Sequence, residues 1–165
     1  MNRLAIPALA ASTVFLAVAA PGAAAQSAPN IAGTWTLVSA TIQQQGGTAS
    51  DVFGPEPLGT IVFGADGGYA LVFLRRGLPR FASNNRASGT PEENKAVVQG
   101  SIAHFGAYTV EDGGRTLVFR VQSGTFPNWD GGEQRRALAL RGDELTYTVA
   151  SSVGGTAQVT LRRAK

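Results

Sequence analysis

Apolar and polar residues alternate along most of this chain, and the first clear alternation is centred on Trp35. Trp35 and Leu37 fall on one face of an extended segment over residues 32–42, whereas Thr34 and Thr36 fall on the other face. A period of two is typical of a β-strand with one face on a core. Seven later segments are also predicted to be strands, and they are residues 58–63, 69–75, 104–110, 115–123, 134–140, 144–150 and 156–163.

Glycine-containing turns separate three pairs of these segments and predict hairpins. Residues 64–68 read Gly-Ala-Asp-Gly-Gly, residues 111–114 read Glu-Asp-Gly-Gly, and residues 141–143 read Arg-Gly-Asp. Turns of this composition favour antiparallel neighbouring strands. The segment 69–74 is apolar on both faces, so we expect it to be covered on both sides, the second side by the helix that follows.

Thr90-Pro91-Glu92-Glu93 predicts the start of the one helix expected after residue 25. Threonine is a common N-cap, proline favours the first helical position, and a glutamate three residues after the cap completes a capping box. We expect the helix to run to about Ile102. Its buried stripe would contain Ala96, Val97 and Ile102.

The predicted elements add up to an all-β fold. Eight antiparallel strands joined in chain order leave two exposed edges unless the last strand pairs with the first. We therefore predict an eight-stranded antiparallel up-and-down β-barrel with one helix between strands 3 and 4. A barrel of this size is either filled by its own side chains or holds one small ligand, so the chemistry of its interior decides its function.

The first 25 residues have the pattern of a cleavable secretory signal peptide. Arg3 supplies a positive start, an alanine-rich apolar stretch follows, and small residues precede a cleavage site after Ala25. The alternative is a membrane anchor, but prolines interrupt the stretch and no stop-transfer pattern follows. We therefore expect a signal peptide over residues 1–25, one barrel domain over residues 26–165, and a periplasmic or secreted location.

Composition excludes several classes of function. The chain has no cysteine, which rules out disulfides, thiolate metal sites and a lipidated N-terminal cysteine. It has 14 basic residues, 11 acidic residues and one histidine, for a net charge of +3. This excess is too small to indicate nucleic acid binding, and a single histidine does not make a zinc site. We expect no metal, no cofactor and no nucleic acid partner.

Extending the alternation along the strands predicts which polar side chains point into the barrel. A buried guanidinium is costly unless it is paired, so Arg136 needs either a nearby acid such as Asp130 or Glu133 or the anionic group of a ligand. Arg163 is instead expected to stack on Trp35. The predicted inward-facing polar residues are Ser39, His104, Tyr108, Gln134, Arg136 and Arg163, among aliphatic side chains and the rings of Phe63, Phe73, Phe119 and Tyr147.

Two candidate site residues lie outside the strands. Arg80 sits between Pro79 and Phe81, and we expect it to turn inward at the mouth of the barrel. Trp129 lies in a loop and is expected to cover an open edge or mouth, with stacking on a ligand as the alternative. The complete set of candidate ligand-binding residues is Arg80, His104, Tyr108, Trp129, Gln134 and Arg136.

Short motifs over nearly all of residues 26–165 carry a family resemblance. They are Gly33-Thr34-Trp35, Phe53-Gly54-Pro55, Leu78-Pro79-Arg80-Phe81-Ala82-Ser83, Gly89-Thr90-Pro91-Glu92-Glu93, Phe105-Gly106-Ala107-Tyr108, Phe126-Pro127-Asn128-Trp129 and Glu133-Gln134-Arg135-Arg136. On these motifs the chain resembles the bacterial and fungal lipocalin-like domain family, which consists of small calycin-type barrels.

The resemblance implies an eight-stranded barrel with a ligand cavity. It also implies a tryptophan on the first strand covered by an arginine near the C-terminus, here Trp35 and Arg162 or Arg163. The pocket positions that it implies are Arg80, Tyr108, Gln134 and Arg136. The chain departs from the family pattern at His104, where a tyrosine is frequent, and at Phe119-Arg120, where a histidine pair is frequent. These departures weaken the case for acid–base chemistry by that pair.

Three hypotheses about function follow. The favoured one is an exported protein that binds a small hydrophobic or amphipathic, anionic molecule near Arg136, Gln134 and Tyr108. The second is an isomerase or cyclase that uses Tyr108 and His104 as general acid and base. The third is a packed structural barrel with no ligand. A binding protein is favoured over an enzyme, and no stable membrane insertion is expected after signal cleavage. The ligand and the oligomeric state are left open.

Overall fold

The computed structural model describes residues 29–44, 47–150 and 155–165. The predicted signal peptide therefore lies outside the described residues. Within the described ranges, no helix is long and apolar enough to cross a membrane. The elements in chain order are β1 (Gly33–Gln43), β2 (Ala49–Asp51), β3 (Leu58–Phe63), β4 (Gly68–Leu74), α1 (Pro91–Gln99), β5 (Ser101–Glu111), β6 (Thr116–Gly124), the 3₁₀-helix η1 (Pro127–Trp129), β7 (Glu133–Arg141), β8 (Glu144–Ala150) and β9 (Thr156–Arg163).

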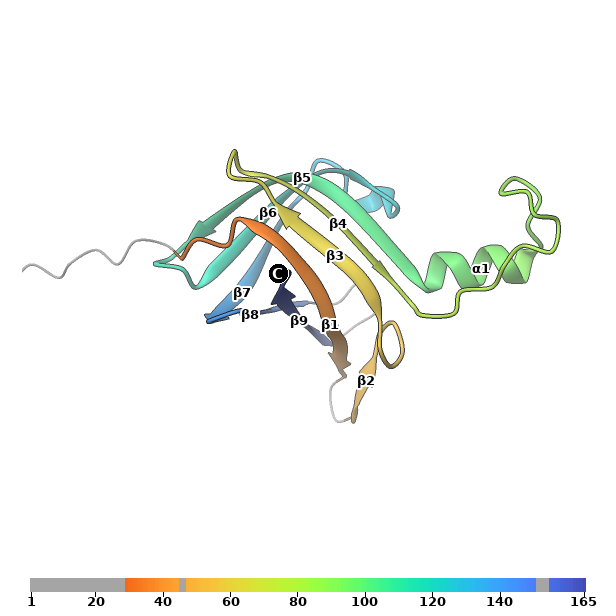
Figure 1. Ribbon diagram of the computed structural model, residues 1–165, viewed down its shortest axis with the longest axis horizontal. Coiled ribbons are helices and arrows are strands. Elements are labelled where there is room, and N and C mark those ends of the chain that lie inside the picture. The colour runs from red at the N-terminus through yellow and green to blue at the C-terminus, as the bar shows by residue number, and fades with distance from the viewer. Residues whose placement is uncertain (1–28, 45–46, 151–154) are drawn as a thin grey trace, which may run out of the picture.

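Eight of these strands close into a barrel (Figure 1). The hydrogen-bonded order is β1-β3-β4-β5-β6-β7-β8-β9, every pair is antiparallel, and β9 pairs back onto β1 from Trp35↔Arg163 to Gln43↔Thr156. The predicted eight-stranded antiparallel up-and-down barrel is confirmed. Because the first strand pairs with the last, the sheet is sealed at the two edges that it would otherwise expose.

The helix does not lie between the third and fourth strands, as predicted, but after β4. The difference arises because Ala49–Asp51 forms an additional short strand, β2, which pairs with the end of β1. Three residues are too few for an alternation of apolar and polar positions to be visible in the sequence. The predicted N-terminus of the helix is confirmed, since Thr90 and Glu93 form the reciprocal hydrogen bonds of a capping box.

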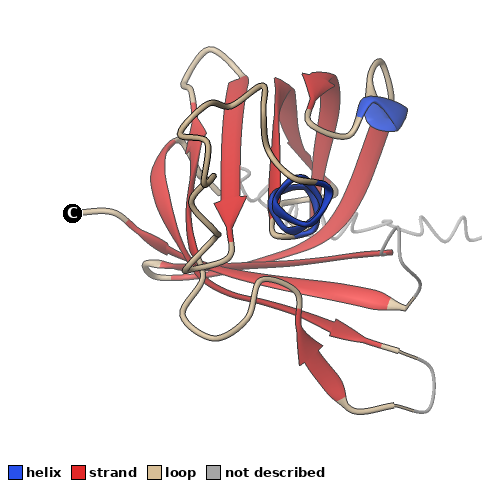
Figure 2. Ribbon diagram, turned by 90° about the vertical axis from the view of Figure 1, so that its right-hand side faces the viewer, coloured by secondary structure: helices blue, strands red, loops and turns tan. Residues whose placement is uncertain are grey.

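The predicted packing of the helix is wrong. α1 projects away from the barrel (Figure 1) and is seen end-on in front of the strands in Figure 2. None of its residues is buried, Val98 is 74% exposed, and the helix ends at Gln99, so Ile102 belongs to β5. The physical reason is that the half-buried face of α1 consists of Glu93, Ala96 and Val97, a short face that includes a carboxylate and offers too little apolar surface to pack on β4.

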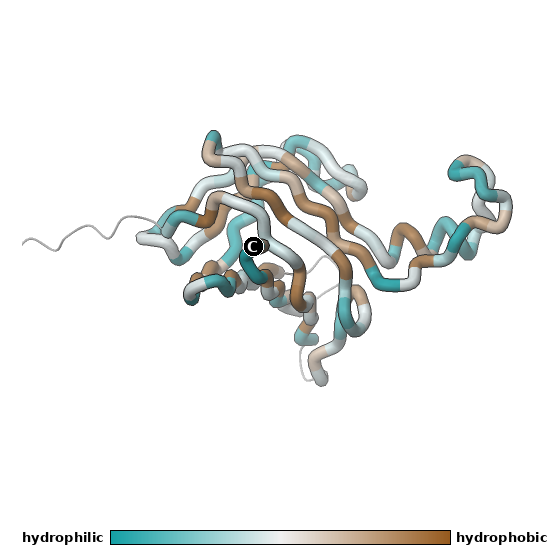
Figure 3. The backbone as a smooth tube through the Cα atoms, viewed as in Figure 1, coloured by the Kyte–Doolittle hydropathy of each residue, from teal (hydrophilic) through white to brown (hydrophobic). Residues whose placement is uncertain are grey.

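The core fills the inside of the barrel. Hydrophobic positions, brown in Figure 3, recur along the strands, and their inward-facing members form one contiguous cluster. One predicted inward residue is misplaced: Ser39 falls on the opposite face from the buried Ala40. An irregularity in the β1–β9 register between Leu37 and Ser39 inserts one residue, Val38, and thereby shifts the phase of the alternation.

Arg163 and Trp35 close one end of the barrel, as predicted. The guanidinium carbon of Arg163 lies 4.2 Å from the ring centroid of Trp35. Its nitrogens donate hydrogen bonds to the carbonyls of Ala32, at 2.9 Å, and Asn30, at 3.2 Å. The Trp35 indole N–H donates to the carbonyl of Ile31 at 2.8 Å. These contacts fasten the segment before β1 across this end of the barrel.

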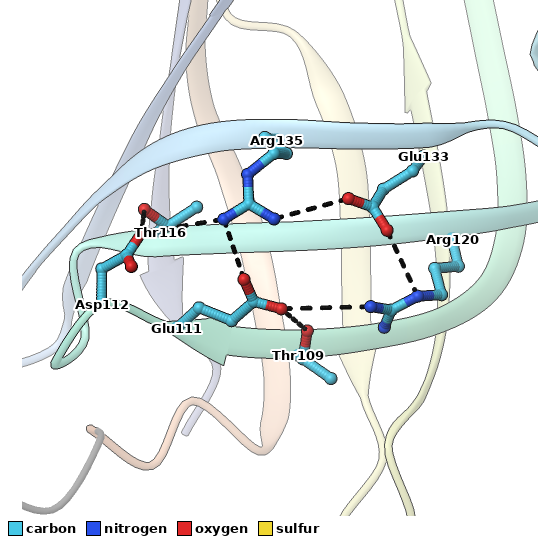
Figure 4. Close-up of polar contacts among 7 residues, drawn as sticks. All are labelled: Thr109, Glu111, Asp112, Thr116, Arg120, Glu133 and Arg135. Carbon is cyan, nitrogen blue, oxygen red and sulfur yellow. Dashed lines mark hydrogen bonds and ion pairs between the residues drawn. The ribbon is translucent and has the colours of Figure 1, made fainter.

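An ion-pair network covers the outside of β5, β6 and β7 (Figure 4). Arg135 pairs with Glu111 at 2.8 Å, and Arg120 pairs with Glu133 at 3.4 Å. Val118 lies on the same outer face, opposite Arg135 in the register, and is nevertheless fully buried. Exposed ion pairs contribute little individually, so we attribute the main effect of the network to the aliphatic parts of these side chains, which shield Val118 from water.

Replacement of Arg163 by methionine should destabilise the barrel. The substitution removes the cation–π contact with Trp35 and two hydrogen bonds to the chain, and we expect the free energy of unfolding to fall by about 1–3 kcal/mol in urea denaturation. The matched control is Arg162→Met, at a neighbouring exposed residue, for which we expect a change within about 0.5 kcal/mol. Equal effects of the two substitutions would contradict a specific role of Arg163.

Candidate functional site

The inward-facing side of β7 carries a buried positive charge. Gln134, Arg136 and Leu138 alternate onto this side, as the sequence predicted, and Arg136 is only 5% exposed. Its guanidinium carbon lies 4.4 Å from the ring centroid of Phe119 on β6 and 4.7 Å from that of Tyr147 on β8. The two flanking strands therefore hold the guanidinium against aromatic faces, where cation–π attraction replaces part of its lost hydration.

Arg136 has few polar partners. Its Nη2 donates a hydrogen bond to Oε1 of Gln134 at 2.5 Å, and the guanidinium also hydrogen-bonds to the phenol of Tyr147, whereas its Nε is buried without a hydrogen-bond partner. Among the described residues no carboxylate pairs with it. The two acids proposed from the sequence are engaged elsewhere, because Asp130 accepts from Ser123 and Glu133 pairs with Arg120 and Arg135 outside the barrel. The charge of Arg136 is therefore not compensated within the described part of the chain.

A second polar pair lies on the inner faces of β4 and β5. The hydroxyl of Tyr69 is 2.7 Å from Nδ1 of His104, and the tautomer of the imidazole decides which of the two donates. Both side chains are buried, with His104 4% exposed. The sequence analysis predicted His104 to point inward but missed Tyr69. The usable signal was the period of two along Tyr69, Leu71 and Phe73, which places a hydroxyl among apolar inward positions.

Burial and the charge of Arg136 determine the protonation of this interior. The pKa of His104 is lowered from 6.5 to about 3, mainly by burial and secondly by the positive charge of Arg136. Burial raises the pKa of Tyr69 and of Tyr147 above the ordinary value of 10, although Arg136 opposes the rise at both. At neutral pH the imidazole and both phenols are uncharged, so Arg136 is the only charged side chain among the buried residues described.

Aromatic rings connect the two polar groups. The ring of Phe119 lies 4.4 Å from that of Tyr69, 5.9 Å from that of His104 and 6.2 Å from that of Tyr147. Phe63 also stacks on Phe119, with 6.0 Å between centroids. The interior thus offers one cation and several phenol or imidazole hydrogen-bonding groups on an aromatic lining. Such a lining suits a flat, largely apolar molecule with a negatively charged group.

Tyr108 and Trp129 lie on opposite sides of this interior. The Tyr108 hydroxyl donates to the carbonyl of Gly64 at 3.0 Å, and its ring is 4.7 Å from that of Phe63, near the barrel end closed by Trp35. Trp129, in η1, places its ring 5.7 Å from the imidazole of His104. Trp129 therefore packs edge-on against His104 near the end of β6.

The structure brings together only part of the predicted site. Arg136 and Gln134 are in contact, and His104 contacts Trp129, but Arg80 is exposed in the loop that leads to α1 and away from the barrel (Figure 1). The acid–base pair of the second hypothesis is not assembled either, because Tyr108 bonds to Gly64 and His104 bonds to Tyr69.

Two hollows are lined mainly by outward-facing residues. One, of about 180 Å³, is lined by Ala139, Arg141, Glu144 and Thr146. The other, of about 340 Å³, lies over β4, β5 and β6 beside Ala70, Ala103, Phe105 and Thr125, and the buried Leu71 and His104 also border it. Neither reaches Arg136. Over the described ranges, no group of three or more histidine, aspartate or glutamate side chains could hold a metal ion.

The single histidine allows a direct test of this electrostatic picture. We expect the NMR resonances of the His104 imidazole to remain those of a neutral ring from pH 7 down to about pH 4. Because the unfolded chain takes up this proton near pH 6.5, the contribution of His104 to stability should be lost as the pH falls from 6.5 towards 3. Arg136→Met should raise the pKa of His104; titration near 6.5 in the unmodified chain would contradict its burial beside Arg136.

The chain is similar in sequence to a curated protein and aligns weakly with two solved structures. The sequence is 31% identical over 78 residues to the 4'-hydroxy-3'-methoxypropiophenone carrier protein of Aspergillus oryzae, an alignment that covers 44% of this chain and 70% of that protein. A redesigned β-barrel aligns with a TM-score of 0.42 at 16% identity, over 82% of this chain and 92% of that chain. An uncharacterized protein from Bacteroides eggerthii aligns with a TM-score of 0.41 at 14% identity, over 81% of this chain and 99% of that chain.

The comparison with protein families covers most of the chain. The family described as the lipocalin-like domain matches residues 32–163, which span every strand of the barrel. This match confirms the resemblance seen in the short motifs, and the chain belongs to the lipocalin-like domain family.

Proposed function

We propose that this chain is a binding or carrier protein for a small aromatic anion, held inside the barrel with its negative group on Arg136. The observation that carries the proposal is the buried guanidinium of Arg136, which has only neutral partners, the Gln134 amide and the Tyr147 phenol, a free Nε and no carboxylate among the described residues. A buried charge without a counter-charge costs several kcal/mol of folding free energy. An anionic ligand that accepts from Nε would offset this cost in the bound state.

The environment of Arg136 supports an aromatic body for the ligand. Phe119 and Tyr147 lie against the guanidinium, and Tyr69 and His104 contact the ring of Phe119. Offset and edge-on contacts with such rings favour a flat aromatic molecule over a fatty acyl chain. The two hollows described above do not reach Arg136, and the larger one borders His104, so we propose that a ligand enters from the His104 side of the interior.

The name of the Aspergillus oryzae relative supports an aromatic ligand. It is called a carrier protein for 4'-hydroxy-3'-methoxypropiophenone, an aromatic ketone with a phenol para to its carbonyl group. A para carbonyl group delocalises phenolate charge, so such phenols ionise more readily than tyrosine. Acidic phenols and aromatic carboxylates are therefore the two ligand types that we propose. The signal-peptide pattern of residues 1–25 extends the proposal to a location outside the cytoplasm.

Binding should depend on Arg136. Isothermal titration at pH 7 with 4-hydroxy-3-methoxybenzoate, and at pH 9 with 4'-hydroxy-3'-methoxypropiophenone, should show binding that Arg136→Met weakens by about 30-fold or more, the loss expected when a buried charge loses its partner. The matched control is Arg141→Met, which removes an exposed arginine from the same strand and should leave the affinity unchanged. Equal affinities of all three proteins, or no binding of either probe, would count against the proposal.

The same substitution should stabilise the ligand-free protein. Methionine fills a volume similar to that of the arginine stem without a buried charge, so we expect Arg136→Met to raise the free energy of unfolding by about 1–3 kcal/mol in urea denaturation. A barrel in which Arg136 serves only as a packing residue predicts the reverse, because the two cation–π contacts would be lost without compensation. A loss of stability would therefore favour the packed-barrel hypothesis.

A further inference from the structure

Residues 75–100 form an arm that leaves the barrel between β4 and β5. The arm consists of a loop followed by α1, and it projects from the strands (Figures 1 and 2). Its base is tied by a hydrogen bond from the Arg75 amide to the carbonyl of Gly100, at 2.7 Å. Further along, Glu93 accepts from the amides of Ala82, at 2.9 Å, and Thr90, at 2.8 Å. These bonds give the arm a defined conformation although it packs little on the barrel.

The arm carries an excess of positive charge. It contains five basic residues and two acidic ones, a net charge of +3 that equals the formal net charge of the whole chain. All five basic side chains are exposed. One of the two carboxylates, that of Glu93, is already engaged by backbone amides. Among the described contacts, Arg76 is the one basic residue of the arm in an ion pair, with Glu56. The other basic residues of the arm are Arg75, Arg80, Arg86 and Lys95.

The shape of the arm suits a planar anionic surface better than a protein groove. A protein groove that accepts a helix needs an apolar stripe at helical spacing, and α1 has no such stripe and no buried residue. A planar anionic surface needs only accessible cations on long side chains, aided by an exposed apolar residue such as Val98. Each lysine or arginine close to an anionic bilayer contributes about 1 kcal/mol, so four of them suffice for weak, reversible binding.

The arm also has a definite place on the barrel. It joins the end of β4 to the start of β5, whereas Arg163 and Trp35 close the opposite end of the barrel. Trp129 and His104 lie towards the end that carries the arm, because Gly124, at the end of β6, pairs with His104. We propose that the basic arm docks this end of the barrel on the surface of an anionic lipid bilayer, without insertion.

Vesicle co-sedimentation tests the proposal. We expect the full chain to bind vesicles that contain phosphatidylglycerol more tightly than pure phosphatidylcholine vesicles, and the difference should vanish at about 0.5 M salt, where charges are screened within a few ångströms. The triple variant Arg80→Gln/Arg86→Gln/Lys95→Gln should reduce the partition coefficient for the anionic vesicles at least tenfold, since three contacts of about 1 kcal/mol are lost. Residues 1–28 are the same in every variant, so their contribution cancels.

The control removes the same charge from the other end of the barrel. Arg115→Gln/Arg141→Gln/Arg162→Gln replaces three exposed arginines near the Trp35 end and should retain the binding of the unmodified chain. Equal losses in both triple variants would show that net charge alone governs binding and would overturn the proposal, as would equal binding to both vesicle types. Retention on immobilised polyglutamate, with no preference for anionic vesicles, would identify an acidic protein as the partner and would also overturn it. Circular dichroism verifies that each variant is folded.

Discussion

The pairing of β1 with β9 is the constraint on which the rest of this structure depends. It turns a sheet of consecutive hairpins into a closed barrel and thereby creates an interior from which water is largely excluded. The last residue of the pairing, Arg163, also covers the tryptophan at the start of β1. One set of contacts therefore closes both the circumference of the barrel and one of its ends.

Closure of the barrel removes Arg136 from water. In an open sheet the guanidinium of Arg136 would remain hydrated, whereas inside the barrel it keeps only an amide and a phenol as hydrogen-bond partners, together with two aromatic faces. Its charge acts beyond these contacts, because together with burial it holds the neighbouring imidazole neutral. A protein under selection for stability alone would gain by replacing this residue, so its presence supports a role in binding.

The two ends of the barrel differ in what closes them and in the charge that they carry. The end at Trp35 is fastened by hydrogen bonds and a cation–π contact, while the other end carries the 3₁₀-helix over His104 and the basic arm. The ion-pair network on β5, β6 and β7 lies on the outer wall between these ends and carries no excess positive charge, because its two arginines face three carboxylates (Figure 4). The excess positive charge of the chain is therefore concentrated on the arm, so the two ends of the barrel differ in charge.

The sequence by itself determined the strands, the hairpins, the capping box of the helix and the inward direction of Arg136, Gln134 and His104, because each depends on residues close together in the chain. Only the tertiary structure decided the rest. The inserted residue before Ser39, the short strand β2 and the contact of Tyr69 with His104 depend on the register between strands, which local alternation does not contain. The capping box in the sequence shows where the helix begins, but it does not show what the helix packs on. Packing requires complementary faces on the helix and on the barrel, and these are visible only in the tertiary structure.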